Sequence, residues 1–290
     1  MNNNNNEIVF VDPMSDIGFK KIFANEYVLI TFLNLLLASQ KKTIRKITYL
    51  NKESITQSED KMMIFDLYCE ADDGTNFIIE MQRRSEPNYI ERTLFYMGQA
   101  VSEQPKPGFK WKYDLAPVIG VFFLNFHLSR YKKPEHTVRC FTLKDQNNKK
   151  LTDLFQMFFV DLRSFTKSES ECVDSMDRWL YVIKNAKNLK KMPFVTQEEV
   201  FATIADVASY SKLTKEERWA YDESLKHARD WEWIVDGERQ DAREEGIGIG
   251  EARGEVKTKN ATAKKMKNKG YSLDDISEIT GLTEEEIMAL

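Results

Sequence analysis

The sequence predicts an α/β protein in which a helix, three strands, a second helix and a fourth strand precede a helical C-terminal region. Three observations predict this fold class. Apolar residues recur at helical spacing between residues 16 and 38. The runs 77–81 and 116–126 are apolar and short, as is typical of strands covered on both faces. From Glu169 onward the pattern becomes helical and strongly charged.

Each element of the first part has its own signal. Ser15 or Asp16 can cap the free N–H groups at the start of the first helix. Pro87 lies near the start of the second helix, where proline is tolerated. The predicted helices cover residues 16–38 and 87–103, and the predicted strands cover residues 43–50, 62–71, 77–81, 116–126, 136–143 and 155–162.

The second part of the chain is predicted to be helical throughout. We place the boundary near residue 165, which gives a first domain over residues 1–165 and a C-terminal region over residues 166–290. The predicted helices of this region cover residues 170–190, 196–210, 214–269, 273–280 and 284–290.

Composition excludes some function classes. The net charge of the chain is −4, so a nucleic-acid contact needs a local patch of Lys and Arg. The three cysteines are far apart and odd in number, which favours reduced thiols in a cytosolic protein. The chain starts with an asparagine run in place of a signal peptide, and its most apolar stretch is too short for a bilayer. We expect a cytoplasmic protein without a membrane partner.

Two carboxylates occupy suspicious positions in the predicted strands. Asp66 follows Phe65 in an alternating segment, and Glu80 interrupts the apolar run 77–81. A carboxylate inside an apolar strand costs free energy unless it is paired, protonated or bound to a metal ion.

The turn between these strands decides which residues face each other. A three-residue loop, Asp72-Asp73-Gly74, is a common hairpin form with glycine in the left-handed conformation. It places Asp66 opposite Glu80, with β-carbons about 5 Å apart. Gln82 shares that face through the two-residue period. A two-residue loop would instead place Asp66 opposite Met81, on the wrong face.

Two carboxylates at this separation repel each other, and a hard divalent cation relieves the repulsion. Mg²⁺ accepts one or two carboxylates and keeps waters and phosphate oxygens as its other ligands. The pair Asp66 and Glu80 therefore predicts a site for Mg²⁺ or Mn²⁺. For Asp66 taken alone, a solvated surface hairpin is the favoured interpretation.

These residues resemble the motifs of a known family. Ile64-Phe65-Asp66 followed by Ile78-Ile79-Glu80-Met81-Gln82 resembles the PD-(D/E)XK nuclease superfamily, and within it the Rpn family of recombination-promoting nucleases and transposases. The stretch 16–23, the stretch 89–96 and the glycine-punctuated tail are also similar to that family. The resemblance implies a restriction-endonuclease-like αβββαβ core, Mg²⁺-dependent DNA cleavage and a role in recombination or mobile-element biology.

One residue departs from the superfamily pattern. Gln82 stands where the superfamily has lysine, and glutamine orients water by hydrogen bonding without adding a positive charge. The Rpn-like group tolerates this glutamine. Two alternatives to an active endonuclease therefore stay open: a catalytically weak or inactive nuclease-fold protein that binds DNA or a partner, and an unrelated α/β scaffold with incidental hairpin acids.

Supporting residues have a functional and a structural interpretation each. Tyr89, Arg92 and Tyr96 share one face of the second helix. Arg92 and Tyr96 are candidates for phosphate contact, and a structural ion pair with core tyrosines is the alternative. Asp16 resembles an acidic residue that assists metal binding in the superfamily, although a helix cap is the favoured interpretation. The pairs Lys20-Lys21 and Arg83-Arg84 are the candidates for a local basic lip on the DNA side, and solvated surface charge is the alternative.

Small residues recur every four positions in the charged tail, at Ala242, Gly246, Gly250 and Gly254. On a helix they would form a stripe along which a second copy can approach, which predicts a homo-oligomer; a flexible linker is the alternative, given the helix penalty of glycine. Ser272 and Thr283 each start a capping-box-like segment. The last helix begins with three glutamates, which favours a packing or partner contact over base recognition.

Overall fold

The computed structural model describes residues 9–40, 42–50, 65–104, 112, 114–128 and 136–290. These residues contain a six-stranded mixed sheet in the order β1-β2-β3-β4-β6-β5. The strands are β1 (Ile47–Tyr49), β2 (Leu67–Ala71), β3 (Asn76–Gln82), β4 (Val118–Leu124), β5 (Val138–Thr142) and β6 (Phe155–Asp161). The α-helices are α1 (Asp16–Phe23), α2 (Glu26–Leu36), α3 (Tyr89–Ser102), α4 (Ser175–Asn185), α5 (Val200–Val207), α6 (Lys215–Asn268), α7 (Leu273–Thr280) and α8 (Glu284–Met288).

The centre of the sheet is parallel and its borders are antiparallel. β3 runs parallel to β4, and β4 runs parallel to β6. β1, β2 and β5 join with antiparallel pairing. The carboxyl ends of β3, β4 and β6 therefore meet at one edge of the sheet, where Gln82, Leu124 and Asp161 lie in one row.

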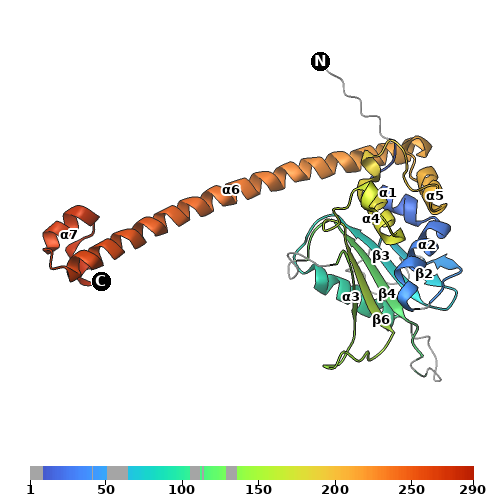
Figure 1. The fold of residues 1–290 in the computed structure, drawn as a ribbon, viewed down its shortest axis with the longest axis horizontal. Helices are drawn as coiled ribbons and strands as arrows, with labels where there is room; N and C mark the ends of the chain where they lie inside the picture. The colour runs from blue at the N-terminus through green and yellow to red at the C-terminus, as the bar shows by residue number, and fades with distance from the viewer. Residues whose placement is uncertain (1–8, 41, 51–64, 105–111, 113, 129–135) are drawn as a thin grey trace, which may run out of the picture. The chain divides into compact units, whose positions relative to one another are not determined.

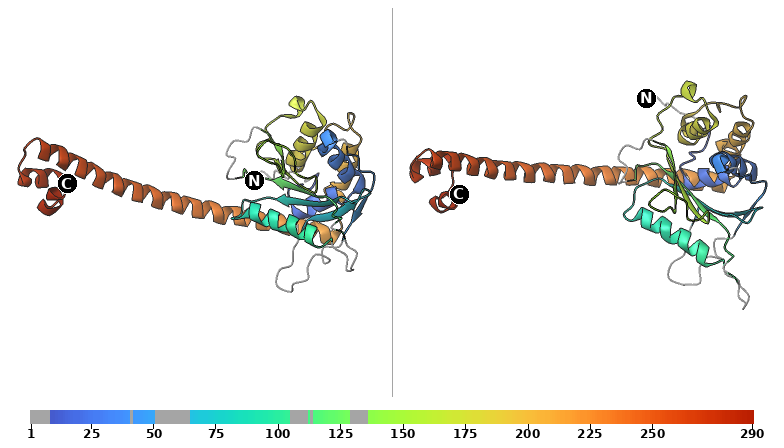
Figure 2. Two further views of the ribbon diagram at one scale, coloured as in Figure 1. Left: turned by 90° about the horizontal axis from the view of Figure 1, so that it is seen from below. Right: turned by 60° about the horizontal axis from the view of Figure 1, so that its bottom comes forward.

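Helices cover both faces of the sheet. α3 lies alone on one face in the views of Figures 1 and 2, and α1, α2, α4 and α5 lie on the other. The second face is aromatic: the Phe123 ring on β4 lies 5.5 Å from Phe19 and 5.3 Å from Phe32. Trp179 on α4 extends this cluster, with its ring 5.1 Å from Phe32. This arrangement of a covered sheet agrees with the α/β fold that the sequence predicts.

The order of the predicted elements is confirmed. The prediction of one helix over residues 16–38 is wrong, because the structure has two helices there. The chain forms α1 and α2 in place of one helix over residues 16–38, and Asn25 begins the second helix by accepting a hydrogen bond from the Val28 N–H. Asparagine favours such a cap because its side chain competes with the helical backbone. Ser15 caps α1 by accepting from the Gly18 N–H.

Several predicted elements are shorter in the structure. β1 covers three residues of the predicted strand 43–50, and α4 and α5 lie inside the predicted helices 170–190 and 196–210. β2 begins at Leu67, and residues 62–64 of its predicted range lie outside the described residues. The strands β4, β5 and β6 lie within their predicted ranges.

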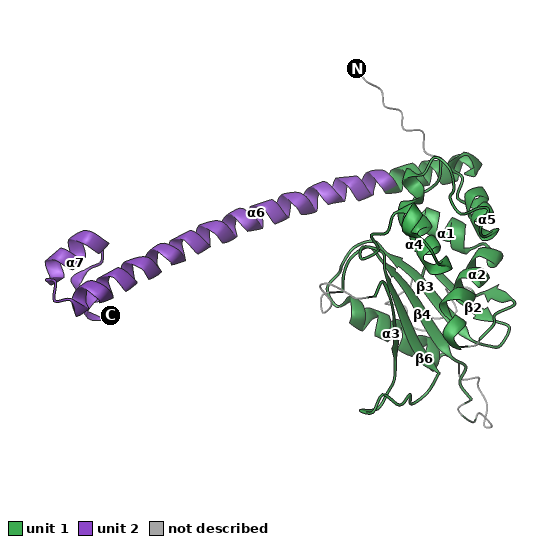
Figure 3. Ribbon diagram, viewed as in Figure 1, with its two compact units in different colours: residues 1–224 green, residues 225–290 purple. Residues whose placement is uncertain are grey.

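The chain divides by its contacts into two compact units, Met1–Ser224 and Leu225–Leu290 (Figure 3). The first unit includes α4 and α5, because Trp179 on α4 packs against Phe32 on α2 and against Phe201 on α5. The boundary near residue 165 stays a prediction, and the contacts of α4 and α5 lie with the sheet-bearing unit.

The second unit consists of most of α6 together with α7 and α8 (Figure 3). α6 is one continuous helix, although glycine is unfavourable in helix interiors. Ser272 and Thr283 cap α7 and α8, as their spacing predicts. Ala263, Ile276 and Ile287 form the small buried core of this unit. Among the described residues, no helix is both long enough and apolar enough to cross a bilayer.

Candidate active site

The hairpin of β2 and β3 has the register that the sequence predicts. Leu67 pairs with Ile79, and Tyr68 pairs with Ile78. The Ala71 N–H donates to the Thr75 carbonyl at 2.8 Å, which closes the three-residue turn. Gly74 has a φ of 81°, a left-handed conformation that glycine adopts without steric cost. The observed pairing ends there, and continuing it by one residue would set Asp66 opposite Glu80.

Glu80 points to the face of the sheet that α3 covers. It lies opposite Phe122 in the parallel pairing of β3 with β4, and Phe122 belongs to the core cluster under α3. The Glu80 side chain is buried, with 7% of its surface exposed. Burial of a carboxylate at this depth is costly unless compensating groups surround it.

Asp66 lies directly before β2 and contacts the neighbouring strand. Its Oδ2 atom accepts a hydrogen bond from the Met81 N–H at 2.7 Å, and its side chain is half-buried. This contact fixes the carboxylate next to β3, one residue beyond Glu80. The Asp66 carboxylate is therefore oriented by a backbone group of β3.

Tyr89 is a buried phenol at the start of α3 that feels the charge of both acids. Burial raises the pKa of the Tyr89 phenol well above its ordinary value, and the negative charges of Glu80 and Asp66 raise it further. Both carboxylates are therefore within electrostatic reach of one phenol. The Tyr89 hydroxyl is buried without a hydrogen-bond partner among the described residues. The sequence had offered Tyr89 only as a neighbour of Arg92 on the helix face.

Gln82 uses both ends of its amide in hydrogen bonds. Its Oε1 atom accepts from Arg92 Nη2 at 2.9 Å. Its Nε2 atom donates to the Arg84 carbonyl at 3.1 Å and to Glu86 Oε1 at 3.0 Å. The side chain that replaces the superfamily lysine is thus fixed by three partners, and Arg92 brings a positive charge to it.

Arg92 joins this network through two partners, Gln82 and Glu86. Its Nη1 atom lies 2.5 Å from Glu86 Oε2, and its guanidinium lies 5.1 Å from the centre of the Tyr89 ring. Tyr96 lies on the same helix, and burial raises its pKa, opposed by Arg92 and helped by Glu80. Both the ion pair and the ring contact that the structural interpretation predicted for α3 are present.

Asp16 lies on the other side of the sheet. It occupies the exposed first turn of α1, where it pairs with Lys20, and Ser15 takes the capping position. α1 covers the face opposite α3 (Figure 2), so Lys20 also lies apart from the α3 face. In the structure Asp16 and Lys20 form an ion pair with each other. A role of Asp16 in metal binding and a role of Lys20 in phosphate binding stay predictions.

Arg83 and Arg84 lie in the segment between β3 and α3, both half-buried. Their position directly after Gln82 places their backbone at the end of β3, beside the acidic pair in sequence. Arg84 contributes its carbonyl to the Gln82 amide. A role of their side chains in phosphate binding stays a prediction.

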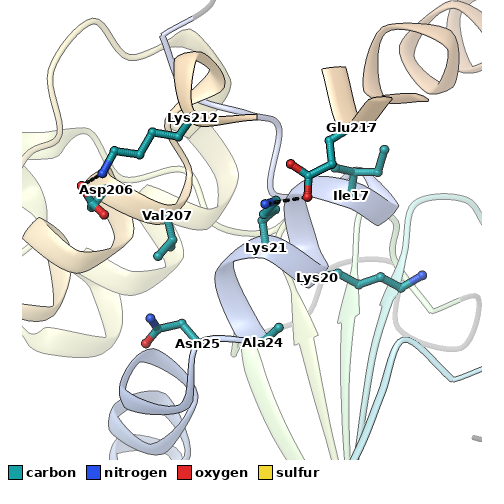
Figure 4. Close-up of a pocket in the computed structure, with 9 residues that line it drawn as sticks. All are labelled: Ile17, Lys20, Lys21, Ala24, Asn25, Asp206, Val207, Lys212 and Glu217. Atoms are coloured by element: carbon teal, nitrogen blue, oxygen red, sulfur yellow. Dashed lines mark hydrogen bonds and ion pairs between the residues drawn. The ribbon is translucent and has the colours of Figure 1, made fainter. Parts of the chain in front are cut away.

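A groove of about 700 Å³ lies between α1, α5 and the start of α6 (Figure 4). Lys20, Lys21 and Lys212 line it, but two of these lysines are engaged inside the groove. Lys21 pairs with Glu217 at 2.7 Å, and Lys212 pairs with Asp206. The charges of Lys21 and Lys212 are therefore neutralised by acidic residues of the same groove. The groove lies away from the α3 face.

A second polar cluster lies at the carboxyl edge of the parallel strands. Asp161 at the end of β6 is fully buried, and its Oδ2 atom lies 2.9 Å from His127 Nδ1. The Ser164 N–H donates to Asp161 Oδ1 at 3.0 Å, and Arg139 approaches the same carboxylate at 3.8 Å. No motif in the sequence predicts this cluster, because its members are distant in the chain.

The donor set of Asp66 and Glu80 fits a hard divalent cation. Two carboxylates from neighbouring strands are the oxygen ligands that such ions prefer. Among the described residues, no group of three or more His, Cys, Asp and Glu side chains gathers as a complete metal cage. Two carboxylates are nevertheless sufficient where water and phosphate complete the shell, as Mg²⁺ sites allow.

The comparison with protein families agrees with this geometry. A family model described as PD-(D/E)XK nuclease family transposase matches residues 13–238, which is more than half of the chain. That range includes the whole sheet and the helix α3 that covers the acidic pair. No curated protein and no solved structure matches the chain. The chain therefore belongs to the PD-(D/E)XK nuclease family of transposases, and its fold is of the PD-(D/E)XK type.

Proposed function

We propose that this protein is a metal-dependent DNA endonuclease that acts in recombination or transposition. The observation that supports this proposal is the β2–β3 register, which ends at the pair Leu67–Ile79 and, continued by one residue, brings Asp66 next to Glu80, together with the hydrogen bond that Asp66 accepts from the Met81 N–H. Family membership supports nuclease chemistry, and members of this superfamily generally use divalent metals. The proposed ion is Mg²⁺ or Mn²⁺, held by Asp66 and Glu80.

The cation would supply two things when bound: a more acidic water molecule and a positive charge that stabilises the phosphate in the transition state. The residues of the chain do the rest. Asp66 is oriented by the Met81 N–H, and Glu80 is held in a buried strand, so both ligands are preorganised. Rigid ligands on strands place a bound ion more accurately than ligands on loops do.

Gln82 and Arg92 share the task that one lysine performs in the superfamily motif. The Gln82 amide supplies hydrogen-bonding groups that orient water or a phosphate oxygen. Arg92 donates to Gln82 and supplies the positive charge that the amide lacks. The proposal therefore assigns substrate contact to Arg92, with Tyr96 beside it on α3.

A second function from another class is supported by one observation. Both N–H groups of the Gln82 amide already donate, to the Arg84 carbonyl and to Glu86, so in this arrangement the amide has no N–H left for a phosphate oxygen. A nuclease-fold protein that binds DNA without cutting it would look the same. Rearrangement of this network on DNA binding separates the two proposals.

The test is a nicking assay on supercoiled plasmid with purified wild-type protein. The proposal expects conversion to open circles in 5–10 mM Mg²⁺ or Mn²⁺, a concentration range of roughly the order that weakly held hard cations require. It expects no conversion in EDTA. DNA binding in a mobility shift without any nicking in either metal would favour the binding protein instead.

A further inference from the structure

The Glu86 carboxylate is held by two donors that come from different elements. Arg92 Nη1 on α3 lies 2.5 Å from Glu86 Oε2. Gln82 Nε2 at the end of β3 donates to Glu86 Oε1 at 3.0 Å. Each carboxylate oxygen thus has its own donor. The loop between β3 and α3 therefore places the Glu86 carboxylate between the end of β3 and the first turns of α3.

The two donors are themselves fixed in place. Arg92 Nη2 donates to Gln82 Oε1 at 2.9 Å, and the guanidinium lies over the Tyr89 ring. The donors therefore keep their direction if Glu86 leaves. Their arrangement forms a preorganised anion site, because a guanidinium and an amide that point at one spot bind a carboxylate or a phosphate with the same geometry.

Glu86 itself is an exchangeable occupant. Its side chain is 48% exposed, and among the described residues its carboxylate makes hydrogen bonds to Gln82 and Arg92 alone. Ion pairs at such exposure contribute little to stability, because water screens them. A phosphate diester that reaches the surface can replace the carboxylate at small cost.

The position of this anion site relates it to the acidic pair. Gln82 follows Glu80 by two residues in β3, so both side chains lie on the face under α3. The adjacent cavity has a volume of about 440 Å³ and is lined by the loop residues Ser85 to Asn88 and the start of α3. A phosphate held by Arg92 and Gln82 would lie directly beside the candidate metal ligands.

We propose that Glu86 occupies a backbone-phosphate subsite of the free protein and leaves it when DNA binds. Glu86 is then an internal competitor of the substrate: its carboxylate stands in for one phosphate of a nucleic-acid strand. Its departure also releases the Gln82 Nε2 group, which can then donate to the phosphate or to water. This inference rests on the proposed function, since it takes DNA as the ligand of the same site.

The experiment measures DNA affinity without cleavage. A fluorescein-labelled 20-base-pair duplex, roughly two helical turns, is titrated with full-length protein in EDTA and followed by anisotropy. Glu86→Gln keeps the shape of the side chain but removes its charge. The expected result is binding about fivefold tighter than wild type, the size that loss of one competing surface ion pair allows.

Two matched variants make the result specific. Glu91→Gln makes the same charge change on an exposed residue that lines the same cavity but has no hydrogen bond or ion pair with Arg92 or Gln82 among the described residues. Its affinity should stay within about twofold of wild type, because it does not compete for their donors and an exposed charge is screened. Arg92→Ala removes the proposed phosphate ligand. In that background Glu86→Gln should no longer tighten binding, because the competitor has nothing left to compete for.

The outcomes separate the two proposals. Equal tightening by Glu86→Gln and Glu91→Gln would overturn the inference, because it would reflect general charge repulsion. Unchanged or weaker binding of Glu86→Gln, with a matched circular dichroism spectrum, would overturn it as well. Absence of DNA binding in every variant would overturn the proposed function together with the inference, whereas wild-type binding with no effect of Glu86→Gln leaves the proposed function standing.

Discussion

The two faces of the sheet differ in the side chains that they bury. The face under α1, α2 and α4 is aromatic: Phe123 is fully buried there and contacts rings from two helices. The face under α3 buries aromatic rings as well, among them Phe122 and Phe159, but it becomes polar where β3 ends, at Glu80 and Gln82. One strand pair therefore stabilises the fold on one side and carries the candidate site on the other.

This difference has a consequence for energetics. A buried carboxylate such as Glu80 destabilises the fold unless its surroundings compensate. The aromatic face provides apolar burial that does not depend on the site, at roughly 25 cal/mol per Å² of buried surface. Substitutions at the polar end of the α3 face should thus lower activity, and substitutions on the opposite face should lower stability.

The largest effect is expected for Glu80→Gln. Removing one charged metal ligand should lower the nicking rate by about a thousandfold or more, since metal stabilisation contributes several kcal/mol to the barrier. The melting temperature should stay equal or rise, because a buried charge facing Asp66 is removed. The measurement is the initial nicking rate together with a thermal melt; a large fall in melting temperature would mean that Glu80 serves the fold.

Phe123→Ala is expected to lower stability and leave the nicking rate of the folded protein unchanged. It should lower the free energy of unfolding by about 3–5 kcal/mol, the usual cost of truncating a buried phenylalanine. Urea denaturation followed by circular dichroism measures it. Phe95→Ala on α3 is the matched control, because 58% of that side chain is exposed, and its change should stay below about 0.5 kcal/mol.

If Phe123→Ala and Phe95→Ala cost the same, the aromatic face does not dominate stability and the comparison of the two faces fails. Residual nicking at the wild-type rate in the folded fraction of Phe123→Ala is the second expected result, since the residue lies on the face away from the site.

A smaller effect is expected at Gln82. Gln82→Ala should slow nicking by about tenfold, because it loses hydrogen bonds that position Arg92. Gln82→Lys should preserve or raise the rate, because it restores the charge of the superfamily motif. A Gln82→Lys variant that is slower than Gln82→Ala would show that the amide geometry, rather than a charge, is needed at the end of β3.

The smallest effect concerns the second unit. We propose that two copies pair along Ala242, Gly246, Gly250 and Gly254, all exposed on α6 with open space around the glycines. Light scattering should then give a particle mass of about two chains for the full-length protein. A truncation before Gly237 should give the mass of one chain. Monomer masses for both proteins would remove the pairing proposal.

The sequence predicts the candidate site better than its supporting contacts. The turn at Gly74 determines the register of β2 and β3, and local turn chemistry can be recognised in a sequence. Glu86 could not be found in this way, since its role depends on how an irregular loop brings it to Arg92. The break between α1 and α2 was missed because the apolar spacing continues through Asn25, whose capping bond decides the matter.

The helical part shows the same limit. The spacing of apolar residues predicts that α4 and α5 exist, but not that Trp179 inserts between Phe32 and Phe201 and so joins them to the first unit. Long-range packing of this kind is set by the tertiary structure. For α6 the recurring glycines left helix and linker as alternatives, and the structure shows a helix.

The central claim is that Asp66 and Glu80 together hold the catalytic ion, and Asp66→Asn tests it most directly. Asparagine keeps an oxygen that can accept from the Met81 N–H, so the fold should be preserved. The measurement is the initial nicking rate of supercoiled plasmid in Mg²⁺, for wild type and Asp66→Asn with matched circular dichroism spectra. The account predicts that the variant shows no Mg²⁺-dependent nicking. A wild-type rate in Asp66→Asn would contradict it.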